Sequence, residues 1–494
     1  MPRIADERQL NPQPQVVHEL LQVLPADCVL AAEDELAPYE CDGLSAFRQR
    51  PMAVALPTTV EQVQAVMRVC HAAAVPVVAR GAGTGLSGGA LPLADGVLLS
   101  LARFTRILEL DPANLTARVE PGVRNLSISE AAARHGLYYA PDPSSQIACS
   151  IGGNVAENAG GVHCLKYGLT VHNILKLKLV SVEGEVFEVG SAAFDAPGLD
   201  LLALMNGSEG MLAVIVEATV KLLPRAERAQ ALLAAFEDVE RAGAAVARII
   251  ASGITPAGLE MMDNPAIRAA EDFAHAGYPR DAAAILICEL DGTNAEVSHD
   301  VMRVREILLD GGATEVRTAR DEAERLAFWK GRKSAFPAVG RISPDYYCMD
   351  GTIPRRELSA VLKRIDELSE HYGLRVANVF HAGDGNLHPL ILYDANQPGE
   401  LDRAEDFGGD ILELCVKVGG TVSGEHGVGV EKLNQMCVQF NTEELEQLHA
   451  LKAAFDPAGT LNPGKAVPTL HRCAEFGAMH VHHGELPFPE LPRV

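Results

Sequence analysis

The sequence lacks most of the features that would place it on nucleic acid or in a membrane. Its 42 Lys and Arg residues are outnumbered by 66 Asp and Glu residues, which gives a formal net charge of −24 at pH 7. Such an excess of negative charge repels nucleic acid and anionic bilayers. No apolar run reaches the roughly 18 residues of a membrane-spanning helix. The composition therefore argues against both partners, and it leaves room for a small anionic substrate in a locally positive pocket.

Closely spaced cysteines are also missing. The ten cysteines never form a C-x-x-C pair, whereas zinc and iron–sulfur sites commonly use such pairs. We therefore expect reduced, buried thiols and no cluster within this chain. The start, MPRIADER, is polar and is followed by no apolar core. A signal peptide is not expected, and the cytoplasm or its membrane face is the expected location.

Length and composition predict several units. At 494 residues the chain exceeds what a single core holds. Strand-like runs with glycine-rich turns come first, and alanine-rich helical stretches then alternate with strands. The helical stretches are 227–251, 293–310 and 355–372, and the strands include 282–290 and 375–382. Interleaving of this kind indicates an α+β fold. The histidine-bearing residues after 467 favour a loose tail over a metal-binding tract.

Two glycine-rich loops indicate a large phosphate-bearing cofactor. The first, RGAGTGLSGG at 80–89, connects a predicted strand to the strand at 96–101. A Rossmann motif needs a helix directly after the glycines, which LSGGALP cannot start, and a P-loop needs Gly-Lys-Ser/Thr. Small residues in a loop can turn several N–H groups toward one anion. The second loop, 150–161, adds Asn154 and Asn158 as donors, and together the loops outweigh the alternative of plain tight turns.

Two histidines flank a predicted β-hairpin in VFHAGDGNLHPL, residues 379–390. With an Asp-Gly type I′ turn, His381 faces His388, and facing residues have Cβ atoms about 4.5–5.5 Å apart. Two imidazoles at that separation can share a metal ion of borderline hardness. The later segment SGEHGVG offers Glu425 as a third ligand. The residues alone leave ordinary surface or core histidines as the alternative.

The order of these motifs resembles a known family. PVVARGAGTGLSGGA, PDPSSQIACSIGGNVAENAGGVHCLKYG, NGSEGMLAVIVEATVKLLP and LNPGK follow one another along the chain. They resemble FAD-linked oxidases whose FAD-binding domain is of the vanillyl-alcohol-oxidase/p-cresol-methylhydroxylase (PCMH) type. The resemblance covers roughly residues 40–467. Within the family it is to the flavin subunits of bacterial glycolate oxidases, with D-lactate and D-2-hydroxyglutarate dehydrogenases as near relatives.

This resemblance implies a fold class and a division of the chain. The fold class is α+β, with a two-part PCMH-type FAD-binding domain, an α/β substrate (cap) domain with an antiparallel sheet, and a small helical C-terminal segment. The expected units are an N-terminal segment 1–50, the FAD-binding domain 51–226, the substrate domain 227–418, a helical segment 419–467 that completes the active site, and a tail 468–494.

The resemblance also implies how FAD binds. The glycine loops would wrap the pyrophosphate and the flavin edge, and a cation beside the isoalloxazine would favour reduced flavin. Some relatives bond the flavin covalently through a histidine in the first loop. Ala82 and Thr84 stand there in this chain, so noncovalent FAD is expected. The predicted cofactor-binding residues are Arg80, Gly81, Ala82, Gly83, Thr84, Gly85, Pro141, Asp142, Ser145, Ser150, Gly152, Gly153, Asn154, Asn158, Gly160, Gly161, Ile215, Asn462 and Lys465.

A metal site is implied as well. In the hydroxyglutarate-type relatives, the residues that match His381, His388 and Glu425 hold a divalent metal, usually described as zinc. By this resemblance, the metal would bind the carboxylate and hydroxyl oxygens of a 2-hydroxy acid and lower the pKa of the hydroxyl. His426 would accept the hydroxyl proton as a general base, because an imidazole titrates near neutral pH.

Substrate recognition is expected from three further positions. Arg332 matches the carboxylate-binding arginine of the relatives and could hold the anion with two hydrogen bonds. Asn386 lies on the hairpin, where it would touch the substrate. One position departs from the hydroxyglutarate-type pattern, in which a lysine pairs with the distal carboxylate. Cys348 stands there instead, which favours glycolate or D-lactate over a dicarboxylate.

The implied function is FAD-dependent oxidation of glycolate to glyoxylate, and of D-lactate to pyruvate. A second FAD-type subunit and an iron–sulfur subunit would pass the electrons to quinone, and these partners would hold the enzyme on the inner face of the cell membrane. No nucleic acid partner is expected. Two alternatives stay open: a D-lactate or D-2-hydroxyglutarate dehydrogenase that acts alone, and a non-catalytic flavin-binding subunit, which should lack the metal ligands and the base.

Overall fold

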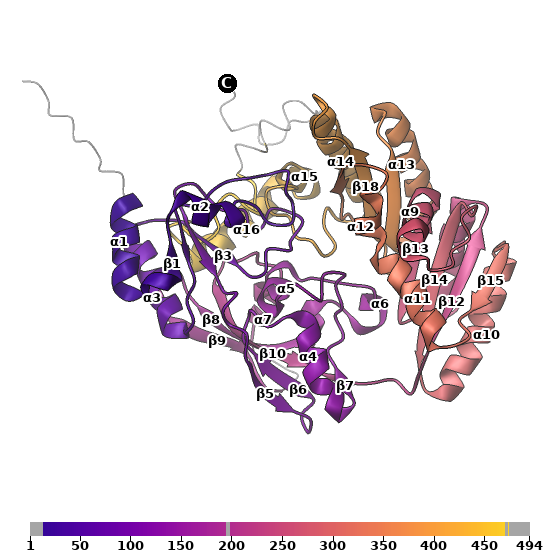
Figure 1. Cartoon of the computed structure of the whole chain (residues 1–494), viewed down its shortest axis with the longest axis horizontal. Helices are drawn as coiled ribbons and strands as arrows, with labels where there is room; N and C mark the ends of the chain where they lie inside the picture. The colour runs from indigo at the N-terminus through magenta and orange to yellow at the C-terminus, as the bar shows by residue number, and fades with distance from the viewer. Residues whose placement is uncertain (1–12, 194–197, 470–472, 474–494) are drawn as a thin grey trace, which may run out of the picture.

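Two lobes, each built on its own β-sheets, make up the described residues 13–193, 198–469 and 473 of the computed structural model (Figure 1). The first lobe comprises residues 13–224, and the second lobe comprises residues 228–417. A C-terminal segment, 418–469, runs back from the second lobe onto the first. No helix among the described residues is long and apolar enough to cross a membrane.

The first lobe contains two larger sheets. One has the strand order β1-β2-β4-β3, and the other has the order β5-β6-β10-β8-β9. Its strands are β1 (Val29–Leu30), β2 (Ala53–Ala55), β3 (Val77–Arg80), β4 (Val97–Ser100), β5 (Ile107–Asp111), β6 (Thr116–Val119), β7 (Leu137–Tyr138), β8 (Ile174–Val180), β9 (Val186–Gly190), β10 (Val214–Lys221) and β11 (Leu223–Pro224). Its helices are α1 (Gln13–Val23), α2 (Glu33–Leu36), α3 (Val60–Ala72), α4 (Asn125–Ala132), α5 (Ile151–Glu157), α6 (Cys164–Tyr167) and α7 (Leu201–Met205), with short 3₁₀ turns between them.

The second lobe is a seven-stranded sheet of order β15-β12-β14-β13-β17-β18-β16, in which all described pairs are antiparallel. Its strands are β12 (Arg228–Phe236), β13 (Gly258–Asp263), β14 (Ala284–Gly292), β15 (Glu315–Thr318), β16 (Asp345–Cys348), β17 (Val376–His381) and β18 (Asn386–Tyr393). Its helices are α8 (Val239–Ala251), α9 (Asn264–Ala274), α10 (Asn294–Asp310), α11 (Glu322–Lys333), α12 (Ala335–Val339), α13 (Leu358–Tyr372) and α14 (Glu400–Lys417). The predicted antiparallel cap sheet is thus present.

The cap sheet has a hydrophobic core on each face. Helices α8, α10, α13 and α14 cover one face, and helices α9, α11 and α12 cover the other. Val162 of the first lobe packs into this second core beside Trp329 of α11. Leu44 of the first lobe is in turn part of the core on the other face, so first-lobe residues pack against both faces of the cap sheet.

The C-terminal segment joins the first lobe through β3. The Val77 amide donates to the Thr460 carbonyl, and the Asn462 amide donates to the Val77 carbonyl, both at 2.8 Å. Leu461 is buried in the core of this lobe. The segment carries helices α15 (Leu433–Gln439) and α16 (Thr442–Phe455), which confirms the predicted short helical region. The predicted tail lies almost wholly outside the described residues.

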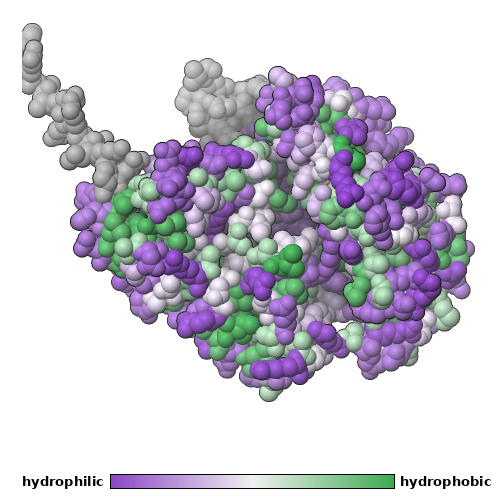
Figure 2. Space-filling model, in the orientation of Figure 1, coloured by the Kyte–Doolittle hydropathy of each residue, from purple (hydrophilic) through white to green (hydrophobic). Residues whose placement is uncertain are grey.

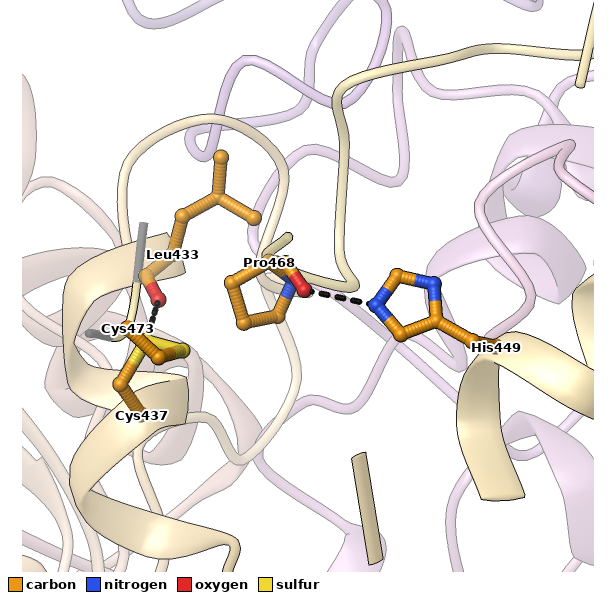
Figure 3. Close-up of a disulfide and its surroundings, with 5 residues drawn as sticks. All are labelled: Leu433, Cys437, His449, Pro468 and Cys473. Carbon is orange, nitrogen blue, oxygen red and sulfur yellow. Dashed lines mark hydrogen bonds between the residues drawn. A yellow bond between two sulfur atoms is a disulfide. The ribbon is translucent and has the colours of Figure 1, made fainter. Parts of the chain in front are cut away.

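A disulfide links Cys437 of α15 to Cys473, with 5.2 Å between the two Cα atoms (Figure 3). Nearby, the His449 ring on α16 lies 2.9 Å from the Pro468 carbonyl oxygen. The expectation that all cysteines are free thiols is therefore wrong for this pair. The two residues are 36 positions apart in sequence, so no local pattern marks them. The eight other cysteines are free, and all but Cys41 are buried.

Two local predictions differ from the structure. Residues 228–236 form β12 rather than the start of a helix, because this alanine-rich run lies between two neighbouring strands and is buried on both faces. Tertiary burial can override local propensity in this way. The hairpin also has a different register: His381 pairs with Asn386, and His388 pairs with Val379. The loop is therefore longer than a type I′ turn, and of its residues Gly385 alone has a positive φ, of +86°.

Candidate active site

A cavity of about 490 Å³ lies where the two lobes and the C-terminal segment meet, and Figure 2 shows the surface recessed between the lobes. The first lobe lines one end with its glycine loops. The second lobe and the C-terminal segment line the other end with His381, His388, Glu425 and His426. The predicted cofactor-binding residues that line it are Arg80, Gly81, Ala82, Gly83, Thr84, Gly85, Ser145, Ser150, Gly152, Gly153, Asn154, Gly160 and Ile215.

The remaining predicted cofactor residues, which are Pro141, Asp142, Asn158, Gly161, Asn462 and Lys465, lie outside the cavity lining. Two of them, Asn462 and Lys465, stabilise the first glycine loop by hydrogen bonds to backbone carbonyls in and next to it. The Asn462 side chain donates to the Gly89 carbonyl at 2.9 Å, and Lys465 Nζ donates to the Leu91 carbonyl at 2.8 Å. Their direct contact with FAD stays a prediction, while their support of the loop is visible.

The second glycine-rich stretch contains a short helix rather than an open loop. Ser150 caps α5 by accepting a hydrogen bond from the Gly153 amide, and such a cap offsets the low helix propensity of Gly152 and Gly153. Close packing requires small residues here. A Cβ at Gly152 would lie 2.6 Å from Pro121, and one at Gly160 would collide with the Glu425 carboxylate. The lack of a side chain at Gly160 thus lets the first lobe approach Glu425.

Three side chains at the other end of the cavity have the geometry of a metal site. The Glu425 Oε1 atom lies 3.4 Å from His381 Nε2 and 3.0 Å from His388 Nε2. Ligands about 2.0–2.1 Å from a tetrahedral zinc ion are roughly 3.3 Å apart. His388 Nε2 is buried and, apart from this contact with Glu425, has no polar partner within the described residues. The donor set and its spacing fit a divalent cation, and the predicted ligands do come together.

The other ring nitrogens of both histidines are already engaged. His381 Nδ1 lies 2.8 Å from Glu260 Oε1, and His388 Nδ1 lies 3.2 Å from the Met349 carbonyl. A partner at Nδ1 orients each ring and leaves Nε2 for a metal. The histidines share one face of the sheet although the predicted register is wrong, because the observed pairing differs by two residues and side chains alternate with a period of two.

Attraction between carboxylates and histidines stabilises this cluster. Burial alone would raise the pKa of Glu425, yet the neighbouring His381 and the contacts with both histidines hold that pKa well below its usual value. Burial would likewise lower the pKa of His381, but the Glu260 and Glu425 carboxylates raise it well above its usual value. A positive charge is therefore favoured at this position, and metal binding to histidine replaces a proton with a cation.

The backbone of the segment that carries Glu425 and His426 is hydrogen-bonded to the buried carboxylate of Asp350. The amides of Gly424, Glu425 and His426 donate to Asp350 at 3.1, 3.1 and 2.9 Å. Lys432 Nζ, also fully buried, lies 3.0 Å from the same carboxylate. Burial disfavours the charged form of Asp350, but Lys432 and His426 hold its pKa below the usual value. This turn brings two adjacent side chains to the same cavity, which an extended strand would not do.

His426 has the environment of a neutral base. Its ring stacks on that of His388, with 4.8 Å between centroids and 14° between planes, and its Nδ1 atom is buried without a hydrogen-bond partner in the described chain. Burial lowers the pKa of His426 to about 4. A neutral imidazole can accept a proton, as the predicted role requires.

Arg332 and Asn386 lie behind the cavity rather than in its lining. Arg332 is fully buried on α11, where its Nη2 atom lies 2.6 Å from Glu260 Oε2. Asn386 is buried at the start of β18, and its Oδ1 atom has no hydrogen-bond partner among the described residues. Their predicted contacts with the substrate stay predictions. In the observed arrangement, Lys333 rather than Arg332 lines the cavity.

Sequence reasoning missed several residues that shape this site. Glu260 lies on β13, Asp350 follows the end of β16, and Lys432 lies beyond the conspicuous glycine motif. None belongs to a local pattern with a chemical meaning. A charged residue in the middle of a mostly apolar strand, as Glu260 is in GLEMMD, was the available signal, because an unpaired buried charge is costly.

Fold and site together define a flavin-dependent oxidase, and comparison with known families agrees. The chain belongs to the FAD-linked oxidase family. A family model described as "FAD linked oxidases, C-terminal domain" matches residues 225–466, and one described as "FAD binding domain" matches residues 51–190. FAD is thus the cofactor of this family of enzymes, as predicted.

Among its relatives is the glycolate oxidase subunit GlcD of Escherichia coli (strain K12), which is 68% identical over 97% of this chain and 96% of that protein. GlcD of Bacillus subtilis (strain 168) is 39% identical over 86% of this chain and 91% of that protein. A D-lactate dehydrogenase of Archaeoglobus fulgidus is 33% identical over 84% and 91%, respectively. The predicted resemblance is therefore confirmed.

Solved structures confirm the fold class. p-Cresol methylhydroxylase aligns with a TM-score of 0.78 over 95% of this chain and 99% of its own, at 18% identity. The 4-ethylphenol oxidase from Gulosibacter chungangensis aligns with a TM-score of 0.79 over 95% and 100%, also at 18% identity. The chain therefore has the predicted PCMH-type fold.

Proposed function

We propose that this chain is the FAD-bearing subunit of an enzyme that oxidises short 2-hydroxy acids, with glycolate as the main substrate and D-lactate as a second one. The observation that carries the proposal is the single cavity with glycine loops at one end and the His381, His388 and Glu425 cluster at the other. The 68% identity to GlcD supports glycolate as the substrate.

The groups in the cavity have separable parts in this reaction. FAD, when bound, supplies the acceptor for the hydride that leaves C2 of the substrate. His381, His388 and Glu425 would hold a divalent cation, for which zinc is the best fit to the donor set and spacing. His426 takes the hydroxyl proton, so that loss of one hydride and one proton converts the 2-hydroxy acid into a 2-oxo acid. The pocket would position both leaving atoms.

Arg332 and Asn386 would complete substrate recognition. Both are buried and lie directly behind the histidine cluster, and both carry polar atoms without hydrogen-bond partners in the described chain: Arg332 Nε and Nη1, and Asn386 Oδ1. Unpaired buried donors and acceptors are costly. A substrate carboxylate would satisfy the arginine after a small shift of the side chain, and we propose this as the ligand-bound arrangement.

Electrons would leave through other subunits. The relatives named GlcD are described as subunits, and this sequence has no cluster motif. A second FAD-type subunit and an iron–sulfur subunit would carry the electrons to quinone, at the inner face of the cell membrane. A dehydrogenase that acts alone is the second candidate, because the D-lactate dehydrogenases also match most of the chain. If the purified chain reduces an artificial electron-accepting dye as fast without partner subunits as with them, that candidate is favoured.

A steady-state panel tests the proposal. Purified chain is supplied with glycolate, D-lactate or D-2-hydroxyglutarate together with an artificial dye that reoxidises the flavin, and reduction of the dye is followed. In separate anaerobic mixtures without the dye, loss of visible absorbance reports flavin reduction. We expect glycolate to give the highest kcat/KM and acid precipitation to release the flavin, since Ala82 and Thr84 offer no covalent attachment. A chain that binds FAD but reduces it with none of the three acids would be the non-catalytic subunit.

A further inference from the structure

Glu260 is a buried carboxylate that has no part in the reaction as described so far. It lies on β13, one residue before Met261, which pairs with Phe380 of β17. The same antiparallel register brings Glu260 beside His381. Its Oε1 atom lies 2.8 Å from His381 Nδ1, and its Oε2 atom lies 2.6 Å from Arg332 Nη2. The Glu260 side chain is only 1% exposed.

We propose that Glu260 is the positioning residue of the metal site: it fixes the tautomer and orientation of His381 and anchors Arg332 behind it. This inference rests on the proposed metal-dependent function. A neutral imidazole carries its proton on one nitrogen, and the partner of that nitrogen decides which one is left for a ligand. When a metal ion displaces the Nε2 proton, the remaining proton is held on Nδ1 by Glu260, and His381 Nε2, which faces Glu425, is the atom left for the metal.

The Arg332 contact determines which oxygen of Glu260 faces His381. Arg332 is fully buried, and Glu260 Oε2 is the carboxylate oxygen nearest its guanidinium. The guanidinium therefore holds one oxygen of Glu260, so the other oxygen stays aimed at His381. Among the described residues, His388 has the weaker Met349 carbonyl as its partner at Nδ1, 3.2 Å away. A carboxylate behind a ligand histidine typically changes metal affinity 10- to 100-fold, so Glu260 should contribute more than Met349.

The same lobe offers a matched control. Glu289 lies on the neighbouring strand β14, is buried, and also contacts a histidine and an arginine, His163 at 3.4 Å and Arg325 at 2.6 Å. His163 belongs to α6's N-terminal cap in the first lobe and is not one of the clustered ligands. If Glu260 mattered only as a buried ion pair, substitution of Glu289 would have the same consequences.

The decisive variant is Glu260→Gln, which keeps the size of the side chain. Arg332 will draw the amide oxygen toward itself, and the NH₂ group will then face His381 Nδ1. That favours the tautomer with a proton on Nε2, the wrong one for a ligand, by the logic known for a triad carboxylate replaced by its amide. We expect the Kd for Zn²⁺ to rise about 10- to 100-fold, with FAD content and melting temperature close to those of Glu289→Gln.

The measurement is competition for Zn²⁺ against a chromophoric chelator, with the FAD-loaded protein, alongside flavin content and thermal unfolding. Excess Zn²⁺ should restore part of the turnover in Glu260→Gln. Because one buried charge without its partner could prevent folding, the double variant Glu260→Leu/Arg332→Met, which removes both charges and leaves His381 Nδ1 without its carboxylate partner, is measured as well, and it should also bind Zn²⁺ more weakly than the wild type.

Unchanged Zn²⁺ affinity in either Glu260 variant, with the wild type binding tightly, would overturn the inference and leave the proposed function intact. So would an equal loss of Zn²⁺ affinity in Glu289→Gln, because the effect would then be structural. A wild-type protein that binds no divalent metal would refute the metal-dependent mechanism itself, and the role of Glu260 would fall with it.

Discussion

The two lobes meet at one cavity but build its two ends by different physical means. The first lobe contributes backbone: glycine loops and the capped start of α5, with few titratable side chains. The second lobe and the C-terminal segment contribute titratable side chains that are held by further buried charges, Glu260 and Asp350. Backbone sites tolerate little added volume, whereas side-chain sites depend on identity and charge. Cofactor binding and substrate chemistry should therefore be separable by mutation.

The sharpest test of that separation removes the metal site. His388→Ala deletes one predicted ligand, so glycolate turnover should be lost while the bound flavin spectrum stays close to wild type. Treatment of the wild type with a strong chelator should do the same. Elemental analysis and absorbance spectra measure the two effects. The exposed His371, on α13 of the same lobe, supplies the control His371→Ala, and full activity in His388→Ala would refute the assignment.

Loss of the base should have the next largest effect. His426→Ala should slow flavin reduction by about 10²–10⁴-fold in a single turnover, the usual contribution of a general base. Metal content and FAD affinity should stay near wild type, because Glu425 rather than His426 is the expected ligand. Loss of the metal in this variant would make His426 a ligand, and a rate within a few-fold of wild type would end its assignment as base.

Substrate length should have a smaller effect. Cys348, at the position of the lysine in hydroxyglutarate-type relatives, is buried and does not line the cavity. D-2-hydroxyglutarate then lacks a partner for its distal carboxylate. One charge-assisted hydrogen bond contributes roughly 1.5–3 kcal/mol, so kcat/KM should be about 10- to 150-fold lower than for glycolate. Equal efficiency would point to Lys333, which does line the cavity, as the replacing cation.

In the first lobe, added volume should weaken FAD binding without affecting the metal. A Cβ at Gly81 would collide with the Ser150 hydroxyl that caps α5. Gly81→Ala should raise the Kd for FAD about tenfold, or about 1.4 kcal/mol, and Zn²⁺ affinity should not change. Leu199→Ala is a control, because this side chain of the same lobe is exposed. A loss of metal from Gly81→Ala would show that the two ends of the cavity are coupled.

The smallest expected effect lies where the lobes touch. His163 of the first lobe contacts Asp142 at 3.0 Å and Glu289 of the second lobe at 3.4 Å. Burial alone would lower the pKa of His163, but these carboxylates raise it from 6.5 to about 10. The pair therefore contributes its full stability below pH 6.5 and loses it as pH rises toward 10. The melting temperature should therefore fall as the pH rises from 6.5 toward 10, and His163→Gln should make that fall shallower. An unchanged fall in the variant would show that the His163 contacts do not contribute to stability.

Some features of the fold and of the site could be predicted from local sequence alone. The glycine-rich loops indicated a phosphate-bearing cofactor because small residues expose backbone amides. The Asp-Gly turn predicted in the hairpin placed His381 and His388 on one face of a sheet. That result survived an error in the turn type, because a slip of two residues preserves the face on which a side chain lies. Such features are fixed by backbone geometry over a few residues.

Only the tertiary structure decided how the charges are paired. Glu260 meets His381 because β13 lies beside β17, and Asp350 gathers the amides around Glu425 because two distant segments cross. The strand at 228–236 and the Cys437–Cys473 link were likewise invisible locally. A side chain's partner across more than a hundred residues depends on strand order and register, and burial then makes each such contact energetically significant.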